Sequence, residues 1–139
     1  MMQLSNIIQL ENLHFLPVDG EDRVEMEFTG GCLTLKLYYT NEKEASVRRD
    51  LRFSAASYFL KTPFPGSSVF DCAEDRNLEL LDSLVAYEYS AWLDNARAHH
   101  ARLEGRHYRI FLHSAGIAIH VIAAGYELSA ELRVVPPSA

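Results

Sequence analysis

The feature that most constrains the fold is a register match across the pair Gly30-Gly31. A two-residue glycine turn is typical of the tight connection between neighbouring antiparallel strands. Folding the chain there sets three apolar pairs opposite each other: Phe28 with Leu33, Met26 with Leu35, and Val24 with Leu37. A slip of one residue would turn every one of these side chains to the opposite face. The pattern therefore predicts a β-hairpin with one apolar face.

Turn residues and alternation extend the strand pattern on both sides of this hairpin. The sequence Pro17-Val18-Asp19-Gly20 predicts a turn that places residues 7–16, as a strand, beside Val24 and Met26. Residues 47–55 continue the apolar alternation, and its change of phase after Ala55-Ala56 predicts a bulge. The prolines, glycine and serines of residues 62–68 then predict a loop.

Residues 78–89 fit either a helix face or a strand. We favour a strand over residues 80–89, because Ser90 is then placed to cap the start of a helix. That helix is predicted over residues 91–103, and Gly105 is expected to end it.

A second hairpin is predicted near the end of the chain, with its turn at Ala115-Gly116. This turn pairs apolar residues on one face: Leu112 with Ile119, Ile110 with Val121, and Tyr108 with Ala123. Alternation over residues 126–134 predicts one more strand. The expected fold is α+β and mainly β, a single domain over residues 1–139. Its core is a curled antiparallel sheet or sandwich of about seven strands with one principal helix, about residues 91–103.

Charge and cysteine content bear on partners and location. The chain has 13 basic and 19 acidic side chains, a net charge of −6, which disfavours non-specific binding to nucleic acid. Cys32 and Cys72 are far apart and form no paired motif, which indicates a reducing compartment. The start of the chain lacks the pattern of a signal peptide, and the run Ile117 to Ala124 is too short to span a bilayer. A cytoplasmic protein without membrane attachment is therefore expected.

Residue spacing favours no catalytic, metal or cofactor site. The adjacent pair His99-His100 is not the i, i+4 spacing of a helical metal site. In the predicted second hairpin, His113 and His120 are diagonal neighbours on the outer face, roughly 7–8 Å apart. A metal or small ligand there would need a further group from elsewhere in the chain. Cys72 follows a flexible loop and could be exposed, but no neighbouring group would lower its pKa.

The most concentrated functional feature is a run of arginine and histidine. Over residues 97–109 the chain has four arginines, three histidines and one acidic residue. Arginine forms forked contacts with carboxylates and phosphates, so the run predicts an interaction surface that continues onto the adjoining hairpin. Its predicted members are Arg97, His99, His100, Arg102, Arg106, His107, Arg109, His113 and His120. The alternative is a solvated helix end whose cations complement the helix dipole.

Three short motifs in residues 80–128 carry a resemblance. They are Glu88-Tyr89-Ser90-Ala91-Trp92-Leu93, Arg106-His107-Tyr108-Arg109-Ile110-Phe111 and Ile119-His120-Val121-Ile122-Ala123, the last followed by Tyr126-Glu127. Together they resemble a group of small, uncharacterised bacterial proteins, in which an acidic residue is expected where this chain has His120. The resemblance implies a cytoplasmic accessory protein, in some members an immunity protein of a toxin system. It implies no catalytic residues.

The sequence thus predicts a non-enzymatic protein-interaction module, of the immunity type by resemblance, whose acidic strands meet a basic partner. A small-ligand or metal site on the outer face of the C-terminal hairpin is the alternative. Self-association through an exposed sheet edge is a third possibility.

Overall fold

A computed structural model describes residues 2–17, 20–65, 69–78 and 80–134. Its elements in chain order are β1 (Met2–Asn12), β2 (Arg23–Thr29), β3 (Cys32–Thr40), β4 (Ser46–Ser54), β5 (Tyr58–Pro63), β6 (Phe70–Asp71), the 3₁₀ helix η1 (Ala73–Arg76), β7 (Ser83–Ser90), α1 (Ala91–His99), β8 (Arg106–Leu112), β9 (Ile117–Ala123), β10 (Gly125–Leu128) and β11 (Leu132–Arg133). The fold is α+β and mainly β, as predicted. The described residues form eleven strands, of which β6, β10 and β11 span only two to four residues.

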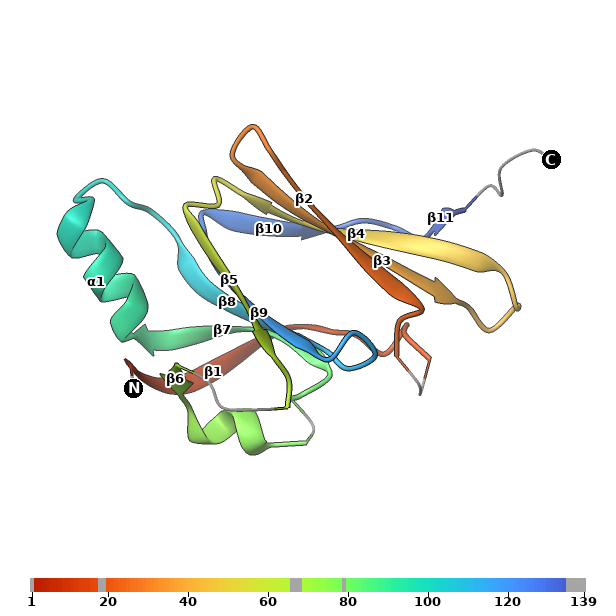
Figure 1. Ribbon diagram of the computed structural model, residues 1–139, viewed down its shortest axis with the longest axis horizontal. Helices are drawn as coiled ribbons and strands as arrows, with labels where there is room; N and C mark the ends of the chain where they lie inside the picture. The colour runs from red at the N-terminus through yellow and green to blue at the C-terminus, as the bar shows by residue number, and fades with distance from the viewer. Residues whose placement is uncertain (1, 18–19, 66–68, 79, 135–139) are drawn as a thin grey trace.

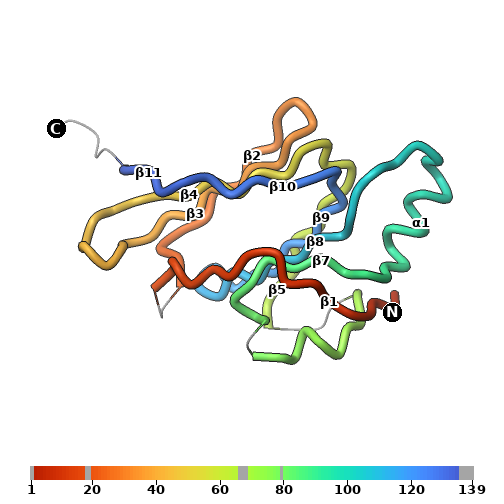
Figure 2. The backbone as a smooth tube through the Cα atoms, turned by 180° about the vertical axis from the view of Figure 1, so that it is seen from behind, coloured from red at the N-terminus to blue at the C-terminus, as the bar shows by residue number. Residues whose placement is uncertain are grey.

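The strands form two sheets that pack face to face. The larger sheet has the order β5-β9-β8-β7-β1-β6 and the smaller β10-β4-β3-β2, with β11 also pairing β4. All pairs are antiparallel except β1 with β6. Front and back views place α1 at one end of the molecule and the turn between β3 and β4 at the other (Figures 1 and 2).

The core between the two sheets is apolar. Leu35, Leu37 and Phe53 of the smaller sheet and Ile110 and Ile119 of the larger are all fully buried in one cluster. Burial of apolar surface at this interface is the main force that holds the sheets together. The opposite face of the larger sheet is covered as well, by α1 and by residues 69–78.

The first predicted hairpin is confirmed in its register. Strand β2 pairs with β3 so that Phe28 lies opposite Leu33, and Met26 opposite Leu35. Gly30 and Gly31 both have positive φ, at 60° and 78°. Residues other than glycine rarely adopt that backbone conformation, which explains the turn at this point.

The predicted place of the N-terminal strand is wrong. Residues 7–16 were expected to pair with β2, but β1 ends at Asn12 and pairs with β7 and β6 in the other sheet. After β1, the backbone N–H of Leu13 donates to Asp82 O at 2.8 Å and the chain crosses between the sheets. Of the predicted turn, Val18 and Asp19 lie outside the described residues, while Gly20 N–H donates to Pro17 O at 2.8 Å.

The change of phase after Ala55 is also a crossover and not a bulge. Ala55 has a positive φ of 47°. The next two backbone N–H groups then bind different sheets: Ala56 donates to Gly31 O at 2.7 Å and Ser57 to Ile122 O at 2.9 Å. Strand β5 thereby joins the larger sheet beside β9 and extends to Pro63, inside the predicted loop. Residues 66–68 of that loop lie outside the described part of the chain.

The second hairpin exists, but its predicted register is wrong by two residues. Leu112 pairs with Ile117, and Ile110 with Ile119. The turn spans residues 113–116, because Gly116 N–H donates to His113 O at 3.1 Å and Gly116 has φ +66°. A shift of two residues leaves each side chain on the same face, so the apolar alternation fits both registers.

The strand and the helix around Ser90 are confirmed, except for the end of the helix. Strand β7 ends at Ser90, whose Oγ accepts a hydrogen bond from Leu93 N at 3.1 Å as the N-cap of α1. The helix ends at His99 rather than Leu103. Beyond it, Leu103 N–H donates to His100 O at 2.9 Å, a turn that brings Leu103 against the same apolar cluster as Leu93. The last predicted strand is divided into β10 and β11, which both pair with β4.

Candidate functional site

The predicted interaction surface divides into an exposed and a buried group. Exposed members are Arg97, His99, His100, Arg102, Arg106 and His113. His107 and Arg109 are fully buried and His120 is only 2% exposed, so the prediction is wrong for these three. Alternation placed them on the outer face of the sheet, and they are there. That face, however, is covered by α1 and residues 69–78.

The buried histidines form a chain of hydrogen bonds that starts at the helix cap. Ser90 Oγ lies 2.7 Å from His107 Nδ1, and His107 Nε2 lies 2.8 Å from His120 Nδ1. Strand β8 supplies His107, and β9 supplies His120. The two rings share one proton between them at the contact, so a neutral pair satisfies this geometry.

Aromatic rings enclose the two imidazoles. The rings of Phe70, Tyr87 and Trp92 have centroids 4.5–5.2 Å from that of His107. Burial, and then the positive charge of nearby groups including Arg109, hold the pKa of both histidines well below the usual value. The pair is therefore neutral at physiological pH.

Arg109 is the centre of a second buried polar cluster on the same face. Its guanidinium pairs with Asp75 Oδ1 at 2.8 Å and donates to the carbonyls of Leu80 and Ser83 at 3.2 and 3.3 Å. The hydroxyl of Tyr87 donates to the other oxygen of Asp75 at 2.8 Å, and burial raises the pKa of Tyr87. This cluster fastens η1 to the sheet, because Asp75 belongs to η1 and Arg109 to β8.

Ser90 and Cys72 are both buried, and each already forms a hydrogen bond within the protein. A nucleophilic serine needs an oxygen that a substrate can reach, but Ser90 is buried and its oxygen already caps α1. Cys72, which the sequence left open to exposure, is also buried. Burial raises the pKa of the Cys72 thiol to about 12, so it stays protonated.

The exposed cations lie along the end of α1 and the loop that follows it. Arg97 donates to Gly105 O at 3.0 Å, and His99 Nδ1 lies 2.9 Å from Asn95 O. Asn95 O lies near the end of α1, where cations are favoured by the helix dipole, whereas Gly105 O belongs to the residue before β8. The geometry thus agrees with the dipole interpretation for His99, and the contact of Arg97 joins the helix to the start of β8.

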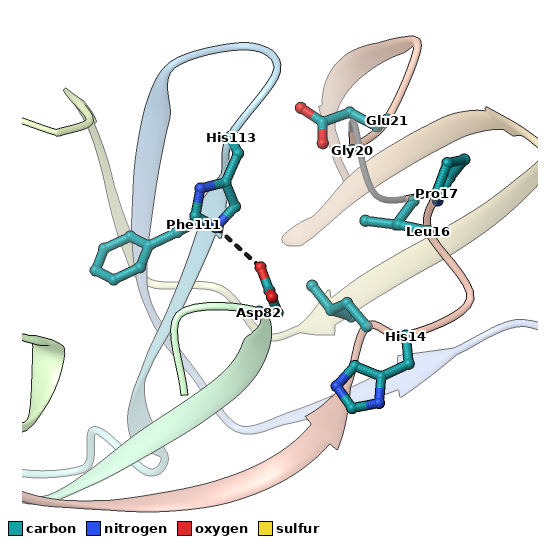
Figure 3. A pocket seen from close by; sticks show the side chains of 9 residues that line it. His14, Leu16, Pro17, Gly20, Glu21, Asp82, Phe111 and His113 are labelled. Atoms are coloured by element: carbon teal, nitrogen blue, oxygen red, sulfur yellow. Dashed lines mark ion pairs between the residues drawn. The ribbon is translucent and has the colours of Figure 1, made fainter. Parts of the chain in front are cut away.

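His113, on the turn between β8 and β9, lines an open pocket (Figure 3). His113 Nε2 pairs with Asp82 Oδ1 at 3.1 Å and lies 3.3 Å from Leu81 O. It does not lie beside His120, which is bonded to His107, so the predicted diagonal pair is wrong. The pocket has a volume of about 420 Å³. Its lining residues are Leu13, His14, Leu16, Pro17, Gly20, Glu21, Asp82, Phe111 and His113.

An exposed aromatic pair marks the edge of the sandwich. The rings of Phe28 on β2 and Phe59 on β5 have centroids 5.3 Å apart, although the residues are 51% and 42% exposed. Strands β2 and β5 are each the terminal strand of a sheet. The pair therefore joins the two sheets at an edge where neither strand pairs with a further strand of the described residues.

Sequence reasoning missed Asp75, Tyr87 and Glu21 as members of these clusters. Asp75 and Glu21 are carboxylates in polar surroundings, and their partners are 34 and 94 residues away along the chain. A usable signal did exist for the histidines. Ser90 was identified as a cap, and His107 shares a strand face with Arg109, so a polar cluster under the helix could have been suspected.

Comparisons with known proteins add no relative. No family model, curated protein or solved structure matches the chain. Among residues 2–17, 20–65, 69–78 and 80–134, no helix is long and apolar enough to cross a membrane. Within the same ranges, no group of three or more histidine, cysteine, aspartate or glutamate side chains could hold a metal ion.

Proposed function

We propose that the protein is a non-enzymatic interaction module that binds a basic partner protein along the edge strand β2. The observation that carries the proposal is the contact between Phe28 and Phe59, two aromatic side chains that remain about half exposed. Exposed aromatic side chains that pack together are typical of the energetic centre of a protein interface.

The backbone of β2 supports an extended partner. As the last strand of its sheet, β2 has one row of N–H and C=O groups that no other strand pairs in the described part of the chain. A partner segment can add to such an edge as a further strand. The other edge, β5, is less suitable, because it carries the exposed Lys61 and ends in Pro63, which lacks an N–H group.

The charge of β2 favours a basic partner. Glu25 and Glu27 are exposed on the strand, and Asp22 is exposed immediately before it. Arg23 and Lys36 pair with Glu25 and Glu27 at 3.2 and 3.1 Å, so Asp22 is the acidic group of this stretch that neither cation neutralises. Together with the net charge of −6, this favours a basic protein over nucleic acid as the partner.

The finer proposal is an immunity-type role in the cytoplasm, in which the partner is a toxin of the same system. The resemblance of residues 80–128 supports this role. Free thiols at Cys32 and Cys72 agree with a reducing compartment. A small-ligand function remains the second candidate, because His113 lines a pocket.

Co-expression with the product of each adjacent gene tests the proposal. We expect one product to form a complex that survives size-exclusion chromatography. In that complex the double variant F28S/F59S should weaken binding by about thirtyfold or more, as measured by calorimetry. The matched control is L132S, which replaces a similarly exposed apolar residue on β11.

Three outcomes would overturn the proposal. Binding that is unchanged in the folded F28S/F59S variant would remove the aromatic pair as the centre of the interface. Failure of the folded protein to bind any adjacent product would remove the partner. Self-association seen by light scattering, and lost in F28S/F59S, would replace the basic partner by a second copy of the chain.

A further inference from the structure

The residues that line the pocket beside the turn between β8 and β9 favour a particular kind of ligand. We propose that it is a binding site for one organic cation with an alkyl stem, an alkylammonium or alkylguanidinium group. Such a group can belong to a free small molecule or to a lysine or arginine side chain of a partner. This inference goes beyond the strand-edge proposal, since it concerns another site and another ligand.

The charged groups of the pocket favour a cation. Glu21 and Asp82 supply two carboxylates, and none of the nine described lining residues is lysine or arginine. In Figure 3, His113 and Asp82 lie on one side of the hollow, Leu16 and Pro17 on the other. His14 and His113 also line the pocket, and His113 Nε2 pairs with Asp82 Oδ1, so Glu21 is the carboxylate that pairs with no other described lining residue. A concave site with an excess of carboxylates raises the local concentration of cations.

Glu21 is the group that makes this site unusual. The residue is only 3% exposed, yet it lines the pocket. Its Oε1 accepts a hydrogen bond from Ala115 N at 2.9 Å, which fixes the carboxylate against the turn between β8 and β9. A carboxylate that has lost most of its water is stabilised strongly by a cation that approaches it.

The backbone around Glu21 is built to keep it in this position. Gly20 has φ +87°, and a Cβ atom on it would lie 2.6 Å from Ser114 Oγ. Glycine adopts this backbone conformation readily, and a side chain here would displace Ser114 Oγ from its position between the two loops. The close approach of the two loops brings Glu21 to Ala115 and forms the pocket between them.

Apolar side chains complete the site. Leu13, Leu16 and Pro17 line the pocket, and Leu16 and Pro17 lie together on one side of it (Figure 3). Phe111 contributes only its edge, because Phe64 stacks on the ring at 4.1 Å between centroids and Arg109 lies 3.9 Å from the centroid. The stem of an alkyl cation can therefore pack on hydrocarbon while its charged end faces the carboxylates. A bare metal ion would gain nothing from these apolar side chains.

Titration with n-butylammonium and n-butylguanidinium, followed by amide chemical shifts in NMR, tests the site. We expect saturable shifts at Glu21, His113 and Ala115, with dissociation constants in the millimolar range for ligands of this size. The variant E21Q keeps an oxygen that can accept from Ala115 N, and it should weaken binding by about tenfold. Neutral n-butanol is the control ligand, and E88Q, at an exposed position on β7, is the control variant.

D82N provides a second test should E21Q fold poorly, because the Asp82 side chain is well exposed. It should weaken binding by about two- to threefold. Shifts that do not saturate by about 50 mM, equal binding of n-butanol, or full affinity in both variants would overturn the proposal. None of these results depends on Phe28 or Phe59, so this site and the strand-edge proposal can fail separately.

The source of the cation is assigned with N-acetyl-lysine amide and N-acetyl-arginine amide. Affinity equal to that of the alkyl cations would support the site and indicate a side chain of a partner protein. Binding of the alkyl cations alone would support the site and indicate a free small molecule, because the peptide groups are then excluded. If none of the four cations binds, the site does not exist as proposed.

Discussion

The six-stranded sheet has two buried faces that differ in what holds them. The inner face packs leucine, isoleucine and phenylalanine side chains against the second sheet. The outer face lies under α1 and residues 69–78 and carries Arg109, His107 and His120 among aromatic rings. Ile119 and Arg109 are equally inaccessible to solvent, yet only Arg109 needs a specific set of partners to remain so.

This difference teaches that the covering segments, and not the strands, decide the role of the polar residues. Strand alternation places Arg109 and His107 on the outer face in any case. The segments that cover this face bury both side chains and supply their partners: Asp75 of η1 binds Arg109, and Ser90, the N-cap of α1, binds His107. We therefore expect substitutions on the outer face to be more costly, and to depend on pH, whereas those on the inner face follow volume alone.

The largest effect is expected for Asp75→Ala. Removal of this carboxylate leaves the guanidinium of Arg109, which is 0% exposed, without its counter-ion. The free energy of unfolding should fall by about 3–5 kcal/mol in urea denaturation. Arg109→Met should cost less, because the Asp75 side chain left behind is 22% exposed and can be hydrated.

Asp71→Ala is the matched control for this pair, since Asp71 is exposed on β6, close to η1 in the chain. It should change stability by no more than about 0.5 kcal/mol. If Asp75→Ala is as mild as this control, the outer face does not depend on its ion pair.

The next effect is a loss of stability in mild acid. His107 and His120 have lowered pKa values in the native protein, so the unfolded chain takes up two protons that the native state does not. The free energy of unfolding should fall as pH drops below about 6.5, by about 2.7 kcal/mol between pH 7.5 and 5.5. Above that range it should not depend on these groups.

His120→Gln should remove about half of this pH dependence, whatever it does to absolute stability. The control is Ile122→Val on the same strand, which removes no titratable group and should leave the pH dependence unchanged. A stability that stays constant from pH 7.5 to 5.5 in the unmodified protein would mean that the two histidines ionise freely in the native state.

Ser90→Ala should have a smaller effect. It removes the cap of α1 and one partner of His107, and should lower the free energy of unfolding by about 1–2 kcal/mol. Ser90→Thr keeps the hydroxyl and serves as the control. Should alanine and threonine be tolerated equally well, the hydroxyl contributes nothing at this position.

The smallest effect belongs to the inner face. Ile119→Val removes one methylene group from the apolar core and should cost about 1 kcal/mol. Because no titratable group is involved, this loss should be the same at pH 7.5 and 5.5. If the loss of unfolding free energy in Ile119→Val varied with pH, the two faces of the sheet would not differ in pH dependence as proposed.

The sequence predicted local structure, such as hairpins and helix caps, better than it predicted which distant strands pair. The Gly30-Gly31 turn is two residues long, so it fixed both the register and the face of the first hairpin. Around Gly116, alternation fixed the face but not the register, since a shift by two residues preserves it. The pairing of β1 with β7 is non-local and left no periodic signal that distinguishes it from pairing with β2.

The buried histidine and arginine clusters were predictable only in part, because their partners also lie in distant segments of the chain. Periodicity placed His107 and His120 on the outer face, but it carries no information on whether another segment covers that face. Asp75 and Glu21 became recognisable only when the fold brought them to Arg109 and Ala115. The exposed aromatic pair likewise depends on contact between strands of two sheets.

The most direct test of this account is the charge state of the buried histidines, measured by ¹⁵N NMR of the imidazole rings. Between about pH 7.5 and 5.5, we predict that the ring nitrogens of His107 and His120 keep the chemical shifts of neutral imidazole. The imidazole shifts of the urea-unfolded chain serve as the reference for free titration. If His107 and His120 titrate instead with midpoints near 6.5, they are accessible to solvent and the outer face is not held as described.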